Sequence, residues 1–484
     1  MTKKILSISD LVLKRALDIV TIIFLVMNFF IWYLNDPSIE ISKYDIYHRW
    51  IIYLLVVLIL NAYRFNPLSF FKDNIFFFLI FALGLYNSYN ILFNFNGTVV
   101  DMGERSRELI LDAFPTFLVI LAVYRLIDKR ALIIGLGLVL LMMVGYSLLA
   151  ILKEHRGLET FLSYQIVNGV RHQSILNNPN VLGEYAFIGI FISLFLSIIS
   201  KKYIYKILSL IPIPILAYGI ILSGSRTGFF MVIALFIIIN LYFIYFNKKS
   251  KIILIVSNII LFIGINIIIS GKFDYFLNRL TSNNDIGGRV PIWLNTFSMI
   301  EDFLYKGIGY SNFTYVYNEL FGKIISPHNL LIGVVAELGI FALIFTVSWF
   351  AYLFIRNHNA IIKNVDNKNR KYLILFNAFY ITFFIGQMSE YSFLKFSSIN
   401  TLFLALQAIN FVLLNKTISN KECILKIWMI LLPSYLLFLL ISNKEISYLY
   451  INSIIFILIF SIAYYGLNKM DEYLNKILLS EILK

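Results

Sequence analysis

The sequence contains few of the residues on which soluble proteins and metalloenzymes depend. Only 14% of its 484 residues are charged, whereas a soluble domain carries about a quarter. The single cysteine, Cys423, excludes an internal disulfide and any cysteine-based metal cluster. The carboxylates do not show the spacing of a metal site, so we expect neither a metal nor a cofactor.

Apolar runs are what the sequence has in excess, with hydrophobic residues making up 60% of the chain. A run of about 18 residues or more can cross a hydrocarbon core, and in lipid it must be helical because every backbone amide needs an internal partner. We therefore predict an all-α, polytopic integral membrane protein, one membrane domain over 1–484, with about fourteen transmembrane helices. The predicted spans are 16–34, 50–63, 74–93, 109–125, 131–151, 181–199, 203–222, 228–246, 252–269, 328–354, 372–386, 397–414, 424–441 and 447–466.

The loops between these spans predict the orientation. The loops richest in lysine fall on one side, together with both termini, and this side is cytoplasmic by the positive-inside rule. The first apolar run lacks a small-residue cleavage pattern, so we expect it to be retained as a span. The net charge of +14 then reflects topology, and we expect no nucleic-acid partner.

Arginine is distributed differently from lysine, because eight of the fourteen arginines fall on the outer side. They are Arg49, Arg105, Arg107, Arg156, Arg171, Arg226, Arg279 and Arg289. Arginine grips phosphate oxygens in a bidentate manner, which indicates an anionic, phosphorylated ligand on that side. Lipid head-group contacts or loop salt bridges are the alternative, and they are favoured for Arg105 and Arg107, which have acidic neighbours.

Two outer polar motifs precede inward-running helices. In Asn177-Asn178-Pro179-Asn180, Asn178 suits the N-cap and Pro179 the first helical position. In Ser225-Arg226-Thr227, an arginine lies in a turn between two spans, where it must be paired or line a wet cavity.

A third motif, Ser326-Pro327-His328-Asn329, begins the next span. We expect Ser326 to cap the helix, Pro327 to start it and His328 to lie in its first turn. Three helix N-termini and Arg171, Arg226 and Arg289 would create a positive site suited to a diphosphate. The same field favours a neutral His328 that can act as a general base, although a helix-capping histidine at the interface is the alternative.

The long outer loop 271–327 contains a further predicted helix, which starts at Gly287-Gly288-Arg289. An apolar stripe follows at helical spacing and predicts a helix along the outer interface, with Trp293 at head-group depth. The stripe consists of Trp293, Phe297, Ile300 and Leu304. After a turn at 307–309, Tyr310, Tyr315 and Tyr317 are candidates for stacking on sugars or for plain interfacial aromatics.

At these residues the sequence resembles the bacterial O-antigen ligase/polymerase family of integral membrane transferases. The similar elements follow the family's order and define an expected catalytic core at 165–345. They are Asn177 to Gly183, Ser225-Arg226-Thr227, Arg289 with Trp293, Gly307 and Gly309, and His328-Asn329 with Gly339. One departure is Tyr305-Lys306, where the family often has proline before the Gly-x-Gly turn.

The resemblance implies transfer of a glycan from a polyprenyl (undecaprenyl) diphosphate to a sugar hydroxyl at the outer face of a bacterial cytoplasmic membrane, without metal. It implies catalytic roles for Arg226, Arg289 and His328. The implied substrate-binding residues are Arg171, Asn177, Asn180, Ser225, Thr227, Trp293 and Asn329. Expected partners are the lipid-linked oligosaccharide, membrane lipid, a flippase and a chain-length regulator. Glu184, Asp285, Glu337 and Glu390 are the carboxylates that could orient His328.

Three functions remain open. A surface-polysaccharide polymerase, making O-antigen, capsule or exopolysaccharide, is favoured by the fourteen spans and by the outer loops 152–180 and 271–327. A ligase that transfers to a different acceptor would use the same residues, but ligases of the family tend to have about twelve spans. A lipid-linked oligosaccharide flippase or transporter is disfavoured, because the span interiors hold few ionisable groups other than Glu337.

Overall fold

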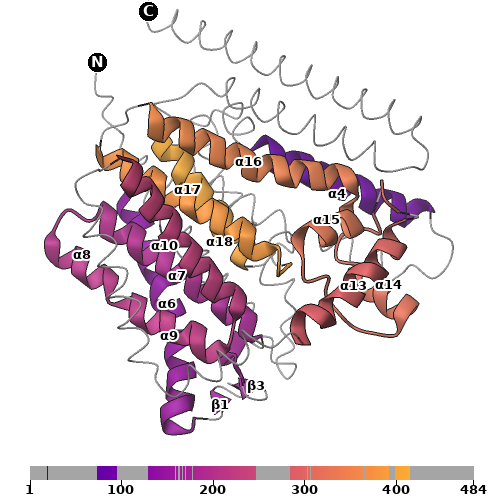
Figure 1. Cartoon of the computed structure of the whole chain (residues 1–484), viewed down its shortest axis with the longest axis horizontal. Coiled ribbons are helices and arrows are strands. Elements are labelled where there is room, and N and C mark those ends of the chain that lie inside the picture. The colour runs from indigo at the N-terminus through magenta and orange to yellow at the C-terminus, as the bar shows by residue number, and fades with distance from the viewer. Residues whose placement is uncertain are drawn as a thin grey trace, which may run out of the picture.

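The computed structural model describes Ile19 and residues 74–94, 129–158, 160–161, 164–165, 167–168, 171–176, 178–246, 284–301, 303–305, 307–363, 367–391 and 398–414. These residues form mainly α-helices (Figure 1). The helices are α4 (Ile75–Asn94), α6 (Lys129–Arg156), α7 (Pro179–Ile199), α8 (Tyr203–Leu210), α9 (Pro212–Ser223), α10 (Arg226–Phe246), α13 (Asn284–Ile300), α14 (Phe313–Phe321), α15 (Leu330–Leu338), α16 (Ile340–Ile362), α17 (Asn367–Gln387) and α18 (Ser398–Leu414).

Five of the described helical stretches are long and apolar enough to cross a membrane. They are Ile133–Arg156, Pro179–Ile199, Tyr203–Ser223, Arg226–Phe246 and Ile340–Ile362. The protein therefore has the character of a multi-pass membrane protein. The predicted spans 16–34 (apart from Ile19), 50–63, 109–125, 252–269, 424–441 and 447–466 lie outside the described residues, so the total of fourteen stays a prediction.

Short strands correct the all-α prediction at one place. β1 (Thr160–Phe161) pairs antiparallel with β2 (Tyr164–Gln165), and β3 (Val167–Asn168) pairs antiparallel with β4 (Arg171–His172). A single 3₁₀ turn, Ser174–Leu176, then leads towards α7. The apolar-run argument finds only helices, because hairpins of two-residue strands leave no periodic signal in a polar loop.

Two predicted spans are interrupted. The span 203–222 is divided between α8 and α9 at Ile211, where Pro212 begins the second helix; proline removes the backbone donor that a continuous helix would need. The span 328–354 is divided between α15 and α16 at Gly339, whose φ is +82°. A residue in the left-handed region ends a right-handed helix, and glycine tolerates that conformation.

Helix α7 is the buried centre of the helical bundle. In the most apolar 18-residue stretch of each helix, 83% of the residues of α7 are buried, compared with 11% of those of α10. α7 contacts α6, α9, α10 and α17 (Figure 1). Aromatic packing joins α7 to α17, as Phe191 lies 4.3 Å from Phe379 between ring centroids. α7 is thus held on several sides, whereas α10 leaves most of its surface for other contacts.

A second apolar core lies beside the bundle, in what we call the α13–α15 layer (α13, α14, α15 and the turn 307–310). Its buried residues are Ile292, Met299, Ile300, Ile308, Phe313, Tyr317, Val335, Ala336 and Ile340. The layer is continuous with the bundle because α16 follows α15 after one residue (Figure 1). This layer places Arg289 and His328 against the ends of the bundle helices.

Candidate active site

The start of α7 has the predicted local structure. Asn178 is the N-cap, with φ −151° and its side-chain oxygen accepting from the backbone N–H of Asn180 at 2.9 Å. Pro179 occupies the first turn, where its missing N–H is no loss. Both predictions are confirmed, and the cap leaves the Asn180 side chain free to face the neighbouring helices. Asn177 lies outside the described residues.

The start of α10 forms a tight crossing with α7. α9 ends at Ser223, Gly224 follows with φ +61°, and the Ser225 hydroxyl accepts from the backbone N–H of Gly228 at 3.2 Å. A Cβ at Gly183 would lie 2.3 Å from the Cβ of Ser225, so only glycine permits this approach. Ser225 is therefore a buried cap, and Arg226 and Thr227 begin α10 beside α7.

The start of α15 corrects the sequence interpretation. The helix begins at Leu330, and its N-cap is Asn329, whose side-chain oxygen accepts from the N–H groups of Leu331 at 2.9 Å and Ile332 at 3.2 Å. The predictions that Ser326 caps the helix, that Pro327 starts it and that His328 lies in its first turn are wrong. His328 has φ +48°, and a left-handed residue cannot continue into a right-handed helix.

A compact turn holds His328 in front of this helix. The Ser326 hydroxyl accepts from the backbone N–H of His328 at 3.3 Å. The indole N–H of Trp293 donates to the carbonyl of Pro327 at 3.0 Å. Both contacts hold the chain that leads into the left-handed backbone of His328. Non-glycine residues in such conformations concentrate at functional sites.

Helix α13 contains Arg289 and starts earlier than expected. It begins at Asn284 and continues through Pro291, three residues earlier than predicted. Ile292, Thr296 and Ile300 are buried, whereas Phe297 is 58% exposed. Phe297 points away from the buried core of the α13–α15 layer, and the placement of the stripe along the outer interface stays a prediction.

The Gly-x-Gly turn packs on the end of α15. Ile308 N–H donates to the Ala336 carbonyl at 2.8 Å, and Gly309 N–H donates to the Glu337 carbonyl at 2.9 Å. A Cβ at Gly307 would lie 2.3 Å from the same Glu337 oxygen. The glycines are therefore required for close backbone packing. Among the tyrosines that follow, Tyr310 and Tyr317 are buried, so these two serve the packing of the α13–α15 layer and present no ring face for sugar stacking, one of the two roles left open for them.

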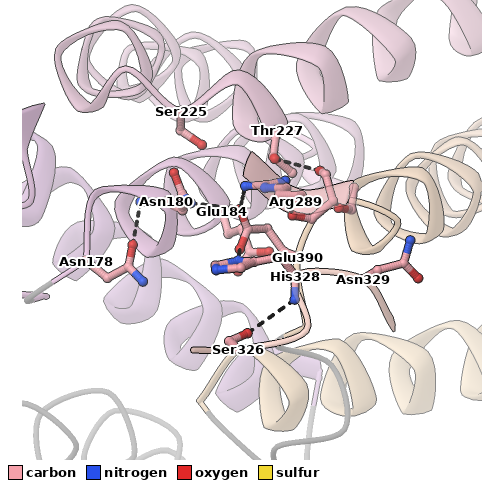
Figure 2. A network of polar contacts seen from close by, with 12 residues as sticks. Asn178, Asn180, Glu184, Ser225, Thr227, Arg289, Ser326, His328, Asn329 and Glu390 are labelled. Carbon is pink, nitrogen blue, oxygen red and sulfur yellow. Dashed lines mark hydrogen bonds and ion pairs between the residues drawn. The ribbon is translucent and has the colours of Figure 1, made fainter. Parts of the chain in front are cut away.

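The segment 387–391, at the end of α17, contacts α7, α10, α13 and the start of α15. Of this segment, the sequence singled out only Glu390. Glu390 is its centre (Figure 2). One carboxylate oxygen accepts from the side-chain amide of Asn180 at 2.8 Å and lies 3.6 Å from the Arg289 guanidinium. The other oxygen lies 3.7 Å from Nδ1 of His328. One carboxylate thus links α7, α13 and the turn before α15.

The neighbours of Glu390 in the segment bind the same elements. The hydroxyls of Ser389 and Thr227 are 2.7 Å apart (Figure 2), and the Ser389 carbonyl accepts from Arg289 at 2.8 Å. The Met388 carbonyl accepts from the Asn329 side chain at 2.8 Å. The three helix starts identified in the sequence therefore converge, and this segment is what brings them together.

Arg171 contacts the site through Asn180 and is not among the residues that line the cavity. Its Nε donates to the Ser223 carbonyl at 2.9 Å, and one terminal nitrogen donates to the side-chain oxygen of Asn180 at 2.5 Å. Asn180 in turn donates to Glu390. Arg171 thus orients Asn180 within the cluster, while Asn180 itself contacts the central carboxylate.

A cavity of about 630 Å³ opens beside this cluster. Its polar end is formed by Asn180, Arg226, Thr227, Arg289, Ser389 and Glu390. Its apolar part is formed by Phe230, Met231, Ile233, Ala234, Ile237, Ile385 and Gly386. Two guanidinium groups therefore lie at one end of a pocket that is otherwise lined by α10 and the end of α17.

Of the four carboxylates that the sequence offered as partners of His328, the structure places one beside it. Glu390 is the one beside His328. Glu184 accepts from Gln387 at 3.0 Å, and Glu337 accepts from the Tyr391 hydroxyl at 2.7 Å. Of Asp285 the structure describes only the backbone. The position of Glu390 just after a predicted span was the available signal; its partners are distant in sequence and could not be read from it.

A known family model matches part of the chain that carries this site. Residues 211–347 match the O-antigen ligase family model. The match supports an O-antigen ligase/polymerase-like family. It indicates a glycosyltransferase-like enzyme. No curated protein matches the chain.

The region of the O-antigen ligase match covers most, but not all, of the cluster. Arg226, Arg289 and His328 lie within it, whereas Asn180 and Glu390 lie on either side. The structure therefore completes the matched region with Asn180 from α7 and with the segment 387–391. Within the described residues, no group of three or more His, Cys, Asp or Glu side chains is arranged to hold a metal ion.

Proposed function

We propose that this protein is a surface-polysaccharide polymerase, which transfers a glycan from a polyprenyl-diphosphate donor to a sugar hydroxyl of a lipid-linked acceptor. The observation that supports this most is the cavity, in which Arg226 and Arg289 stand at one end of an otherwise apolar lining. Guanidinium groups suit a diphosphate, and an apolar lining suits a hydrocarbon chain. A polyprenyl-diphosphate donor has a diphosphate joined to a hydrocarbon chain, so its two parts match the polar end and the apolar part of the cavity.

The apolar part of the cavity follows α10 away from the arginines. From Arg226 to Ile237 the helix rises roughly 16 Å, and Phe230, Ile233 and Ala234 line the path between them. Phe230 and Ile237 are 53% and 52% exposed, so the lining opens to the side of the bundle. In this proposal the isoprenoid chain enters laterally from the bilayer, and its diphosphate stops at the arginines.

His328 supplies the base in the proposed reaction. Glu390 faces Nδ1, which leaves Nε2 for the acceptor hydroxyl. The hydroxyl oxygen bonds to the anomeric carbon while the bond from that carbon to the diphosphate oxygen breaks. The hydroxyl proton passes to Nε2 of His328 and then to solvent. The bonding electrons leave with the diphosphate, whose added charge faces Arg226 and Arg289.

Metal independence is part of the proposal. Two arginines and the N-terminus of α10, which begins at Arg226, provide the positive charge that a divalent cation would otherwise provide. Transfer is therefore expected to continue in excess chelator. We further propose that the face at which α7, α10 and α15 begin is extracytoplasmic. Cysteine labelling at position 226 tests that side, and cytoplasmic labelling would overturn it.

Ligase transfer to a different acceptor is the second candidate, because the matched family model is described as O-antigen ligase. The geometry around Arg226, Arg289 and His328 serves either reaction. The decisive experiment incubates the purified protein with polyprenyl-diphosphate oligosaccharide alone. A ladder of products supports polymerisation, and product that requires a second acceptor supports ligation. Lipid movement across vesicles without any transfer would overturn both in favour of a flippase.

A further inference from the structure

Glu337 is a buried carboxylate that the proposed reaction does not use. Glu337 is 1% exposed and occupies the next-to-last position of α15. Burial penalises a carboxylate, and the C-terminal end of a helix adds unfavourable negative potential. A carboxylate in this position needs donors from elsewhere in the structure.

Two donors reach Glu337 from separate parts of the chain. One oxygen accepts from the backbone N–H of Phe313 at 3.3 Å, and the other accepts from the Tyr391 hydroxyl at 2.7 Å. Phe313 is the first residue of α14, whose N-cap Asn312 makes no side-chain cap hydrogen bond. Glu337 thus caps α14 and at the same time holds the end of the segment 387–391.

The backbone of Glu337 is fixed as firmly as its side chain. Its carbonyl accepts from Gly309, and Ile308 donates to the adjacent Ala336 carbonyl. The ring of Tyr391 fits against Gly333, where a Cβ would lie 2.9 Å from the ring carbons. Burial, reinforced by the Glu337 carboxylate, raises the pKa of Tyr391 well above its usual value, so the hydroxyl keeps its proton and remains a donor.

Tyr391 immediately follows Glu390, whose contacts are sensitive to small displacements. The distances from Glu390 to Arg289 and His328 are 3.6 and 3.7 Å, just beyond hydrogen-bond length. A shift of a few tenths of an ångström would bring one carboxylate oxygen within hydrogen-bond distance of one partner and change its distance to the other. A firm anchor on the next residue would keep the carboxylate between its two partners.

We propose that Glu337 and Tyr391 are positioning residues, whose hydrogen bond sets the Glu390 carboxylate between His328 and Arg289. This inference rests on the proposed function. It also assigns a purpose to the Gly-x-Gly turn, which fixes the backbone at Glu337 rather than contacting substrate. Neither residue lies among those that line the cavity, so their effect must pass through Glu390.

The test is a double-mutant cycle on glycan transfer with Tyr391→Phe, Glu390→Gln and the double variant. Tyr391→Phe removes only the hydroxyl and keeps the ring on Gly333. We expect it to lower kcat by about 10-fold and to change the donor KM by less than about 2-fold. In the Glu390→Gln background it should have no further effect on kcat, because residues that act through one another are not additive.

Tyr317→Phe is the matched control. Tyr317 is another buried tyrosine of the α13–α15 layer, and its hydroxyl accepts from Asn295 at 3.0 Å, away from the segment 387–391. Its activity should stay within about 2-fold of the original. Equal losses for both tyrosine variants, or losses at Tyr391 and Glu390 that multiply, would show a merely structural role and overturn the inference.

Hydrogen exchange separates this inference from the proposed function. Tyr391→Phe should speed amide exchange in 388–391, and Tyr317→Phe should not. Unchanged exchange in Tyr391→Phe overturns the inference even if transfer proceeds normally. If the unsubstituted protein transfers no glycan, the proposed function is overturned, and so is any catalytic role of the Glu337–Tyr391 hydrogen bond. Amide exchange would still report whether that hydrogen bond holds the segment 388–391 in place.

Discussion

The carboxylate of Glu390 lies 3.7 Å from Nδ1 of His328, although the two residues are 62 positions apart in the sequence. The same carboxylate accepts from Asn180 and faces Arg289. The distance is longer than a hydrogen bond, and in the proposed reaction a proton on Nδ1 would face the carboxylate and leave Nε2 to accept the proton of the acceptor hydroxyl. His328 and Glu390 are therefore neighbours across the site, and the proposal makes Glu390 the group that orients His328.

Glu390→Gln should lower kcat more than it changes the donor KM. The amide retains the size of the side chain but removes the negative charge that faces His328 and Arg289. Loss of the charge that faces a catalytic base and a phosphate-binding arginine should cost about 10- to 100-fold in rate, which corresponds to about 1.4–2.7 kcal/mol. Steady-state kinetics measure the split. An unchanged kcat would show that Glu390 does not orient His328.

His328→Ala should remove nearly all transfer while leaving expression and donor binding intact. General-base catalysis contributes about 10²- to 10⁴-fold, and the residue lies outside the helix that follows it. Activity and donor affinity are measured on the same preparation. Asn329→Ala provides the contrast, because Asn329 caps α15: it should lower stability by about 1 kcal/mol. Full activity of His328→Ala would eliminate the base hypothesis.

Arg226→Lys should fail to replace Arg226. Lysine keeps the charge at the polar end of the cavity but cannot grip two phosphate oxygens in a bidentate manner. We expect both Arg226→Lys and Arg226→Ala to abolish chain growth, with weaker donor binding in titrations. The measurement is product formation over a range of donor concentrations. Recovery of activity by lysine would mean that charge alone is sufficient at this position.

Ala234→Phe should obstruct the apolar part of the cavity. Ala234 lines it on α10, and a phenyl ring there would occupy space that the proposal gives to the isoprenoid chain. The donor KM should rise while a short-chain donor analogue is less affected. Leu241→Phe is the control, because Leu241 is also on α10 and is 60% exposed but lies outside the lining. Equal effects of the two variants would contradict the assignment of the lipid.

Gly183→Ala should destabilise the protein, since the added Cβ would lie 2.3 Å from the Cβ of Ser225. Overpacking of this kind costs about 1–3 kcal/mol. Gly137→Ala is the control on α6, where nothing lies within 4 Å of the added atom; it should be neutral or slightly stabilising. Thermal unfolding in detergent compares the two. A stable Gly183→Ala would mean that α7 and α10 cross less closely than described.

The helices of the bundle could be predicted from the sequence because lipid imposes one solution on long apolar runs. The starts of α7 and α10 were also within reach, as Asn178, Pro179 and Ser225 act on backbone groups a few residues away. The start of α15 was not, because Ser326 and Asn329 are both good caps. The left-handed backbone of His328 decided between them, and it is held by Pro327 through the distant Trp293.

Local sequence determined which residues carry the charge and where the chain enters each helix, because caps and apolar runs act over a few residues. It thereby identified Arg226, Arg289 and His328 as candidates. Only the tertiary structure decided which carboxylate lies between Arg289 and His328, that Arg171 contacts Asn180, and that Tyr310 and Tyr317 are buried. These contacts connect segments tens to hundreds of residues apart, and their geometry depends on how α7, α10, α13, α15 and α17 pack together.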